Sequence, residues 1–413
     1  MNTSSYDVAV IGGGPAGATA ATFLQRKGHR CVILESARFP RYHIGESLIP
    51  NTHGTLDRLG LLPRMKASHF PEKHSVRFVS ASGKSSDPFY FSDTVEGDAA
   101  RTWQVERSEF DSICLDHARE NGVEVHRPTR VESLLMEGDQ ATGVLVRPED
   151  GEPREIAASV VIDASGRGTL IGNQLGLKGP VPGLKKASLW TYFKGGERLP
   201  GRDAGETTVF MIPERGWFWY IPLPDDRVSV GVVASPEYLF KGSESFEEAF
   251  LREAGLCAPL GERLVHAERD SPVRGFRELA YLNRQTAGNG WVMIGDAAAF
   301  LDPIYSSGIY LAIASAEMAA DCIDDALSSG DLSAGRLGAY SASLLEGVDV
   351  IHSLINAFYD PDFSFRKFVE RFPEQRPALI DCLVGDVVGK DMSEFLNALA
   401  QMSTPPQPLA SMD

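Results

Sequence analysis

The first 35 residues constrain the fold most, because they place a glycine-rich turn between a strand and a helix. Residues 7–11 (DVAVI) form a β-branched, apolar run that predicts a buried strand. Residues 12–17 (GGGPAG) fit the pattern GxGxxG, and residues 16–27 predict a helix with small side chains facing a sheet. A second strand is expected at residues 31–34. This βαβ unit predicts an α/β fold that binds a dinucleotide.

Each residue type in this turn has a physical reason. Gly12 permits the tight turn, Gly14 lets the backbone approach a pyrophosphate, and Gly17 lets the helix pack closely on the strand. Near Ala16, the start of the helix offers free N–H groups and a favourable dipole to phosphate. Glu35 ends the second strand, at the spacing expected of a carboxylate that accepts hydrogen bonds from ribose hydroxyls.

The charge balance excludes one class of partner. The chain has 413 residues, with 40 basic and 56 acidic side chains and a net charge of −16. Because so acidic a protein does not neutralise phosphates in bulk, we expect no nucleic-acid partner. No apolar run reaches the roughly 18 residues of a membrane span, so no membrane partner is expected.

The cysteines predict the compartment. There are five, they are scattered, and no CxxC pair occurs. We therefore expect neither a disulfide framework nor a metal site. Since the chain opens without a signal peptide, the expected location is cytoplasmic.

The rest of the chain predicts a discontinuous arrangement. Residues 50–65 predict a helix, and residues 108–121 predict another that Ser108 caps. A helix of small residues is expected to begin near Gly308, and the remainder to about residue 401 is helical by periodicity. Strand-rich stretches separate three dinucleotide-binding pieces, so one domain is inserted in the other. The predicted division is a cofactor-binding domain at residues 1–70, 100–180 and 276–330, a β-sheet substrate domain at 71–99 and 181–275, a C-terminal helical region at 331–402, and a disordered tail at 403–413.

Three segments resemble flavoprotein hydroxylases. Residues 161–167 (VIDASGR) are similar to their second cofactor motif and include Asp163. Gly295 and Asp296 are similar to their GD motif, in which the Asp meets the ribityl chain of FAD, and Arg107 sits where they place a flavin-contacting arginine. The resemblance implies a glutathione-reductase-like Rossmann FAD domain of the two-dinucleotide-binding type, with FAD as the cofactor.

Further motifs resemble the flavin-dependent halogenases, on the branch that does not act on tryptophan. Residues 44–50 (IGESLIP) look like the segment beside the flavin and contain Glu46 and Ser47. Residues 216–222 (GWFWYIP) match WxWxIP, and residues 300–308 (FLDPIYSSG) fit FxxPxxSxG, which includes Pro303. Residues 357–363 (AFYDPDF) resemble a C-terminal helix signature of this branch, and the resemblance spans residue 6 to about 370.

The resemblance implies roles for individual residues. The backbone amides of Ser307 and Gly308 would bind halide, and Trp217 and Trp219 would keep organic substrate away from the flavin. Lys73 occupies the position of the lysine that receives the oxidant in this family. Lys84 competes with it but lies in an expected hairpin turn, and Lys66 is interpreted as an ordinary surface lysine.

The implied reaction belongs to secondary metabolism. Reduced FAD (FADH2), O2 and a halide ion such as chloride give hypohalous acid, which passes to Lys73 and halogenates an electron-rich aromatic substrate. That substrate is a phenol, a pyrrole or an acyl group tethered to a carrier protein. A separate flavin reductase is the implied source of FADH2. Two alternatives stay open at this point: a geranylgeranyl-reductase-like or aromatic-hydroxylase-type FAD oxidoreductase (a flavin monooxygenase), and a non-catalytic flavin-binding module.

Overall fold

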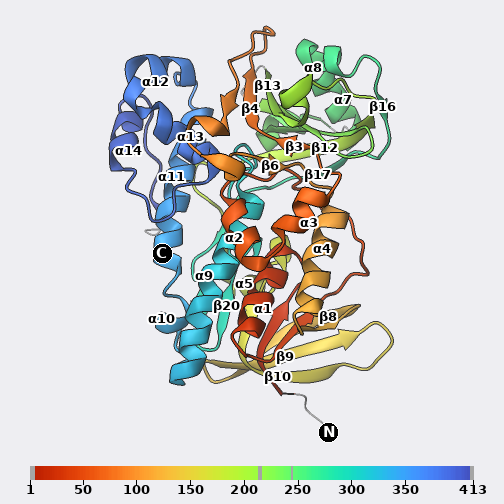
Figure 1. The fold of residues 1–413 in the computed structure, drawn as a ribbon, viewed down its shortest axis with the longest axis vertical. Helices are drawn as coiled ribbons and strands as arrows, with labels where there is room; N and C mark the ends of the chain where they lie inside the picture. The colour runs from red at the N-terminus through yellow and green to blue at the C-terminus, as the bar shows by residue number, and fades with distance from the viewer. Residues whose placement is uncertain (1–4, 213–215, 243–244, 410–413) are drawn as a thin grey trace.

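The predicted βαβ unit forms the centre of one of two large sheets (Figure 1). The computed structural model describes residues 5–212, 216–242 and 245–409. In it β1 (Ser5–Ile11) leads through α1 (Pro15–Arg26) to β2 (Cys31–Leu34), close to the predicted bounds. All four β2 residues are buried, which explains their unbroken apolar run.

The first sheet is mixed, with a parallel centre. Its strands follow the order β19-β20-β10-β1-β2-β7, and β9 pairs with β10 and with β8. The pairs from β20 to β7 are all parallel. Their carboxyl ends therefore meet at one edge, where ligands of open α/β sheets bind. The remaining strands of this sheet are β7 (Glu124–His126), β8 (Thr129–Glu137), β9 (Gln140–Pro148), β10 (Arg154–Asp163), β19 (Ala287–Gly288) and β20 (Trp291–Met293).

Helices cover this sheet, and two of them correct the predictions. The helix α4 (Arg107–Glu120) starts one residue before the expected cap, so Glu106 and not Ser108 occupies the N-cap. Ser108 lies inside the first turn. The helix predicted at residues 50–65 is divided into α2 (Thr52–Leu59) and α3 (Leu62–Ala67), because Gly60 ends α2 with φ of 77°.

The second sheet is mostly antiparallel. Its order is β16-β12-β15-β14-β13-β4-β5, with β17 also paired to β12 and only β4 and β13 parallel. It lies beyond the carboxyl-end edge of the first sheet, in the upper half of Figure 1. Its strands are β4 (Ser75–Val79), β5 (Phe89–Tyr90), β12 (Ala187–Lys194), β13 (Thr207–Ile212), β14 (Gly216–Pro222), β15 (Arg227–Ala234), β16 (Glu268–Arg269) and β17 (Arg274–Phe276).

Short elements join the two sheets. A two-stranded ribbon pairs β3 (Glu72–Lys73) with β6 (Thr102–Trp103). A three-stranded sheet contains β11 (Lys178–Gly179), β18 (Tyr281–Asn283) and β21 (Ala299–Phe300). The short helices are α5 (Leu170–Gln174), α6 (Pro236–Leu239), α7 (Phe246–Leu256) and α8 (Ala258–Arg263).

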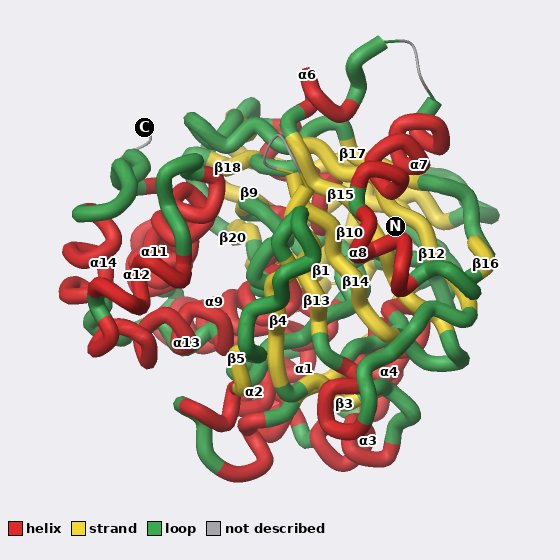
Figure 2. The backbone as a smooth tube through the Cα atoms, turned by 90° about the horizontal axis from the view of Figure 1, so that it is seen from above, coloured by secondary structure: helices red, strands yellow, loops and turns green. Residues whose placement is uncertain are grey.

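The C-terminal quarter is helical and packs beside both sheets (Figures 1 and 2). The long helix α9 (Gly308–Ser329) begins where predicted and packs against α1. It is followed by α10 (Ala334–Leu337), α11 (Ser341–Tyr359), α12 (Phe365–Arg371), α13 (Arg376–Val384) and α14 (Ser393–Ala400). Among the described residues, no helix is both long and apolar enough to cross a membrane.

The tail differs from its prediction. Leu409 is 3% exposed and its amide donates to Asp349 Oδ1 at 2.8 Å, so residues 403–409 lie against α11. The Thr404 carbonyl accepts from Asn356 on the same helix. The expected disorder is wrong for this stretch because the apolar Leu409 finds a buried site that composition alone does not reveal. Residues 410–413 lie outside the described residues.

Candidate functional site

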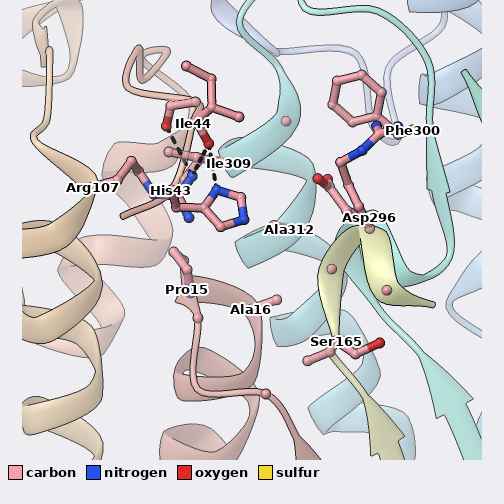
Figure 3. Close-up of a pocket in the computed structure, with 18 of the residues that line it drawn as sticks. Pro15, Ala16, His43, Ile44, Arg107, Ser165, Asp296, Phe300, Ile309 and Ala312 are labelled. Atoms are coloured by element: carbon pink, nitrogen blue, oxygen red, sulfur yellow. Dashed lines mark hydrogen bonds between the residues drawn. The ribbon is translucent and has the colours of Figure 1, made fainter. Parts of the chain in front are cut away.

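A cavity of about 1210 Å³ begins at the carboxyl-end edge of the first sheet and extends to the second sheet. Figure 3 shows part of its wall, with Pro15 and Ala16 of α1 and Ser165 and Asp296 grouped around the same hollow. Its length and its two contrasting ends suit a long dinucleotide. One end is lined by the glycine-rich turn, and the other by aromatic residues of the second sheet.

Two glycines of the turn are required by close packing. A Cβ on Gly12, whose φ is 103°, would lie 2.5 Å from the Ala164 carbonyl oxygen. A Cβ on Gly17 would lie 2.0 Å from the Gly12 carbonyl oxygen. Gly17 does not line the cavity and acts through packing, as predicted, whereas Gly12 and Ala16 do line it.

Gly14 is spared such clashes, and this supports a phosphate ligand. It is the N-cap of α1, and neither a side-chain cap nor an acidic residue occupies the first turn. A Cβ there would meet only Arg41 Nη2, at 3.2 Å. Arg41 Nη1 is buried and lies 3.0 Å from Asp111 Oδ2, at an angle that makes no hydrogen bond. A guanidinium whose Nη1 makes no hydrogen bond, beside a helix N-terminus without a side-chain cap, fits a pyrophosphate.

Glu35 is held in place at the same end. Its Oε2 accepts from the Gly13 amide and its Oε1 from the Ala37 amide, both at 2.7 Å. The carboxylate lines the cavity and is 5% exposed. Each carboxylate oxygen can accept a further hydrogen bond, and the predicted bond to a ribose stays a prediction.

The two aspartates predicted to bind cofactor differ in position. Asp296 lines the cavity, and burial raises its pKa to about 6 against the lowering effect of Arg167 and Arg107. Asp163 does not line it. Its two oxygens accept from the amides of Ser165, at 2.9 Å, and Ile171, at 2.7 Å. Asp163 thus shapes the loop that lines the cavity, and its predicted direct contact with the cofactor is corrected.

Arg107 joins the cavity floor to the segment containing Glu46. Its Nη1 donates to the carbonyls of Ile44, at 2.7 Å, and Gly45, at 3.2 Å, and Asp111 accepts from Nε and Nη2. Figure 3 shows Arg107 and His43 on the same side of the hollow. His43 stays neutral near pH 7, because burial lowers its pKa to about 4.

Glu46 lines the cavity at the far end. It is 2% exposed, and burial raises its pKa to about 7. The Tyr192 hydroxyl donates to Glu46 Oε1 at 2.5 Å, and the Tyr42 hydroxyl, 3.3 Å beyond, accepts from Trp190 Nε1. Glu46 can therefore exchange a proton near neutral pH at the aromatic end.

The two tryptophans face the cavity from β14. Alternate side chains of a strand point the same way, so Trp217, Trp219 and Ile221 share one face. On the paired strand β13, Thr207 and Val209 line the same wall. The indole rings lie 6.1 Å apart between centroids. The wall thus runs from Trp217 to the hydroxyl of Thr207, a span of about 13 Å along four strand residues.

Lys73 lies immediately behind that wall. The strand β3 alternates, with Glu72 exposed and Lys73 only 2% exposed. Lys73 Nζ donates to Ser47 Oγ at 2.9 Å and to the Leu48 carbonyl at 3.1 Å. Ser47 Oγ lies 3.1 Å from Thr207 Oγ1, and both hydroxyls line the cavity although Lys73 does not. The amine therefore reaches the cavity through one hydroxyl.

The surroundings of Lys73 favour its neutral form. Burial lowers its pKa to about 7, and Glu206 opposes this with a weaker raising effect. By contrast, Lys84 is exposed in a turn, and Lys66 pairs with Asp98 on the surface. Of the three candidate lysines, only Lys73 has the burial and the neutral amine of a nucleophile.

The turn before α9 carries the predicted halide residues. Ser306 has φ of 55°, a left-handed conformation, and Ser307 is the N-cap of α9 without a side-chain cap. The first helical bond runs from Leu311 to Ser307, which leaves the amides of the first turn without intrahelical acceptors. Pro303 and Gly308 line the large cavity, whereas Ser307 and Gly295 line a smaller pocket beside it.

The cavity is also lined by residues that the sequence does not single out. Arg41, Tyr42 and His43 stand in the segment before Glu46, so their proximity to it was the available signal. Arg167 follows Asp163, lines the cavity, and donates to the carbonyls of Leu279 and Glu278. Trp190 and Phe276 reach the cavity only through the pairing of β12 with β17, which no local pattern indicates.

Comparison with known proteins agrees with this geometry. The family model described as FAD binding domain matches residues 5–346. The chain is 30% identical to a 1H-pyrrole-2-carbonyl-(peptidyl-carrier protein) chlorinase of Pseudomonas fluorescens, over 97% of this chain and 94% of that protein. It is 31% identical to the corresponding brominase of Pseudoalteromonas luteoviolacea, over 79% of each.

Solved structures show the same architecture. The flavin-dependent brominase Bmp2 superposes with a TM-score of 0.86 at 28% identity, over 96% of this chain and 98% of that one. The myxobacterial chondrochloren halogenase CndH, described as a variant of FAD-dependent halogenases, superposes with a TM-score of 0.81 at 32% identity, over 97% and 96%. The mixed α/β fold with several sheets is therefore shared with both.

Proposed function

The chain belongs to the flavin-dependent halogenases, and we propose that it passes hypohalous acid along the β13–β14 wall to Lys73, which halogenates an electron-rich aromatic ring. The observation that carries this proposal is the placement of Lys73: a buried amine, with its pKa lowered to about 7, one hydroxyl away from a cavity fit for FAD. A reductase or hydroxylase has no use for such an amine behind its substrate wall.

The same reasoning extends to the cofactor domain. We infer that the first sheet, with its parallel centre and its glycine-rich turn, is a Rossmann domain of the two-dinucleotide-binding type. FAD is the cofactor. Gly14, Arg41 and Glu35 would hold its ADP half, and Asp296 and Arg107 would lie toward the ribityl chain. We keep the predicted domain boundaries as part of this proposal.

When bound, reduced FAD supplies the redox chemistry: FADH2, O2, halide and one proton give FAD, hypohalous acid and water. The chain's own residues serve this chemistry in separate places. The free amides at Gly308 offer halide the positive end of α9. Glu46, with its pKa near 7, can supply the proton. Trp217 and Trp219 fill the wall and keep a bulky ring from the reacting end.

Lys73 then receives the halogen. The lone pair of the neutral amine either accepts a hydrogen bond from hypohalous acid or attacks its halogen, forming an N–halogen bond and releasing water. The aromatic ring takes the halogen in the next step, and its displaced proton returns to solvent or to the amine. Ser47 and Thr207 orient the amine and the acid at the point of transfer.

The relatives suggest the substrate class. Two of them are described as acting on a pyrrole-2-carbonyl group carried by a peptidyl carrier protein. We propose a pyrrole or phenol, either free or tethered in this way, and a separate reductase as the source of FADH2. No described part of the chain provides a second glycine-rich turn of the α1 type for a nicotinamide cofactor.

Mass spectrometry tests the proposal. The protein would be supplied with FADH2 from a generic flavin reductase, O2, bromide and either phloroglucinol or a pyrrole-2-carbonyl carrier protein. Brominated product that depends on the protein and on bromide supports the function. If no substrate of either class gains bromine while NADPH alone reduces the bound flavin, the hydroxylase or reductase alternative takes its place.

The pH dependence should report the Lys73 amine. Its pKa is lowered to about 7, so the ammonium form, which has no lone pair, predominates below that value. We expect the ratio of halogenated product to oxidised FADH2 to fall about tenfold per pH unit below pH 7 and to level off above it. The ratio is measured from pH 5.5 to 8.5 with an excess of monochlorodimedone, an enol that traps acid that has left the protein, and it divides out pH effects on the rate of flavin oxidation. A ratio that does not change across this range contradicts the assignment.

A further inference from the structure

The end of α11 meets both β14, which carries Trp217, and the turn before α9 at residues 302–308, called the halide turn below. Trp217 Nε1 donates to the Tyr359 hydroxyl at 2.8 Å, and this hydroxyl donates to Asp302 Oδ2 at 2.9 Å. Asp302 Oδ1 accepts from the Ile304 amide at 3.0 Å, which fixes the start of the halide turn. Three segments that are distant in sequence are thus joined through one tyrosine.

The hydrogen bond between Trp217 and Tyr359 helps to fix the orientation of the buried indole. Trp217 is 1% exposed, and a buried indole N–H without an acceptor costs roughly 1–3 kcal/mol. Phe358 packs on the same indole with ring centroids 6.5 Å apart at 90°. The indole orientation is therefore set by two neighbouring residues of α11, one by shape and one by a hydrogen bond.

Neither Tyr359 nor Asp302 lines the large cavity, whereas Trp217, Pro303 and Ile304 do. Lys186 Nζ lies 3.5 Å from the centroid of the Tyr359 ring and holds it from the other side. The tyrosine is the last residue of α11, and Asp360-Pro361 stops the helix there. The position of Tyr359 therefore depends on where α11 ends, and residues 357–363 (AFYDPDF) contain this end.

We propose that Tyr359 is a positioning residue that clamps the Trp217 indole to the halide turn and so keeps hypohalous acid on the path to Lys73. This inference rests on the proposed function. With the clamp in place, the cavity wall is continuous between the turn and Trp217. Without it, the indole and the turn move independently, and hypohalous acid escapes to water before it reaches the amine.

Tyr359→Phe tests the clamp, because it removes the hydroxyl and retains the ring beneath Lys186. Escaped acid would be measured with monochlorodimedone, an enol whose absorbance falls when it is halogenated, in the presence of FADH2, O2 and bromide. We expect the halogenated enol per oxidised FADH2 to rise about fivefold over the wild type. Brominated phloroglucinol formed without the enol, per oxidised FADH2, would change less, because free acid also reacts with phenols.

A matched control separates positioning from general loosening. The Tyr340 hydroxyl, near the other end of α11, donates to the Met293 carbonyl at 2.6 Å, so Tyr340→Phe also removes one buried hydrogen bond. We expect this variant to release acid as the wild type does. Hydrogen exchange of flavin-free protein supplies a readout independent of turnover: Tyr359→Phe should speed exchange at the last turn of α11, and Tyr340→Phe should not.

The outcomes distinguish the two proposals. Wild-type release from Tyr359→Phe, despite faster exchange at the end of α11, overturns the clamp and leaves the halogenase function intact. Absence of any bromination by the wild type, of either enol or phenol, overturns the proposed function and the clamp with it. If Tyr359→Phe fails to fold, Trp217→Phe breaks the same bond from the other side and is expected to release acid equally.

Discussion

Replacing Lys73 with methionine should abolish halogenation while the protein continues to oxidise FADH2. The product rate should fall about 100-fold or more, because a methionine thioether that meets hypohalous acid is oxidised to the sulfoxide, releasing halide and a proton, and passes no halogen to the ring. FADH2 oxidation should stay within about twofold of the wild type. The measurement pairs flavin absorbance with brominated product formed in the presence of excess monochlorodimedone, which traps acid that has left the protein. Loss of both activities together would place Lys73 in flavin binding instead.

Stability gives this variant an internal control. Lys73 is buried and its pKa falls from 10.5 to about 7 on folding, so the unfolded chain binds the proton more tightly between these values. The contribution of Lys73 to the free energy of unfolding of the wild type therefore rises as pH increases from about 7 to 10.5. Below pH 7 the buried amine is charged, and this charge lowers the free energy of unfolding most. Methionine removes that cost.

We expect Lys73→Met to melt at a higher temperature than the wild type at pH 6.5, with a gain of roughly 1 kcal/mol after the lost bonds to Ser47 and Leu48 are counted. The gain should shrink at pH 9. Thermal unfolding at both pH values checks it, with Lys84→Met as the exposed control, whose difference in melting temperature from the wild type should hardly depend on pH. A destabilised Lys73→Met at both pH values contradicts the assignment of a functional, destabilising amine.

Replacing Gly14 with valine should prevent FAD binding without unfolding the chain. A Cβ at this position meets no backbone atom and only the tip of Arg41, so the fold tolerates it. The added methyl groups occupy the approach to the α1 N-terminus, where the pyrophosphate would lie. We expect the dissociation constant for FAD to rise roughly 100-fold, as flavin fluorescence titration would show.

The control for this variant is Gly255→Val on the exposed surface of α7, where a Cβ meets no atom within 4 Å. Both variants should retain the far-ultraviolet circular dichroism of the wild type, and only Gly14→Val should lose flavin. In contrast, Gly17→Val should fail to fold, because its Cβ would lie 2.0 Å from the Gly12 carbonyl oxygen. FAD binding by Gly14→Val at wild-type affinity would exclude a phosphate site at α1.

Local sequence patterns predict an element correctly where the residues of that segment alone determine its structure. The strand at residues 31–34 is buried along its whole length, so its apolar run marks it without ambiguity. The glycine pattern anticipates the clash at Gly17, which arises within the turn, whereas the clash at Gly12 is with the Ala164 carbonyl oxygen, far along the chain. The start of α9 at Gly308 follows from the same kind of local signal.

Other features depend on contacts that no segment shows alone. Asp163 stands at the predicted strand end, but Ile171 turns its carboxylate away from the cavity. Family resemblance points to Lys73, but the burial of its side chain follows only from the pairing of β3 with β6. The tail around Leu409 was expected to be disordered because its partner, Asp349, is distant in sequence.

The hydrogen bonds that Glu35, Asp163 and Arg107 make within the protein carry a kinetic consequence. These side chains already sit in fixed rotamers, so FAD finds a preorganised site and little side-chain entropy is lost on binding. Flavin that reaches the site is therefore captured on encounter, without waiting for a conformational change. The same preorganisation slows its release once it is bound.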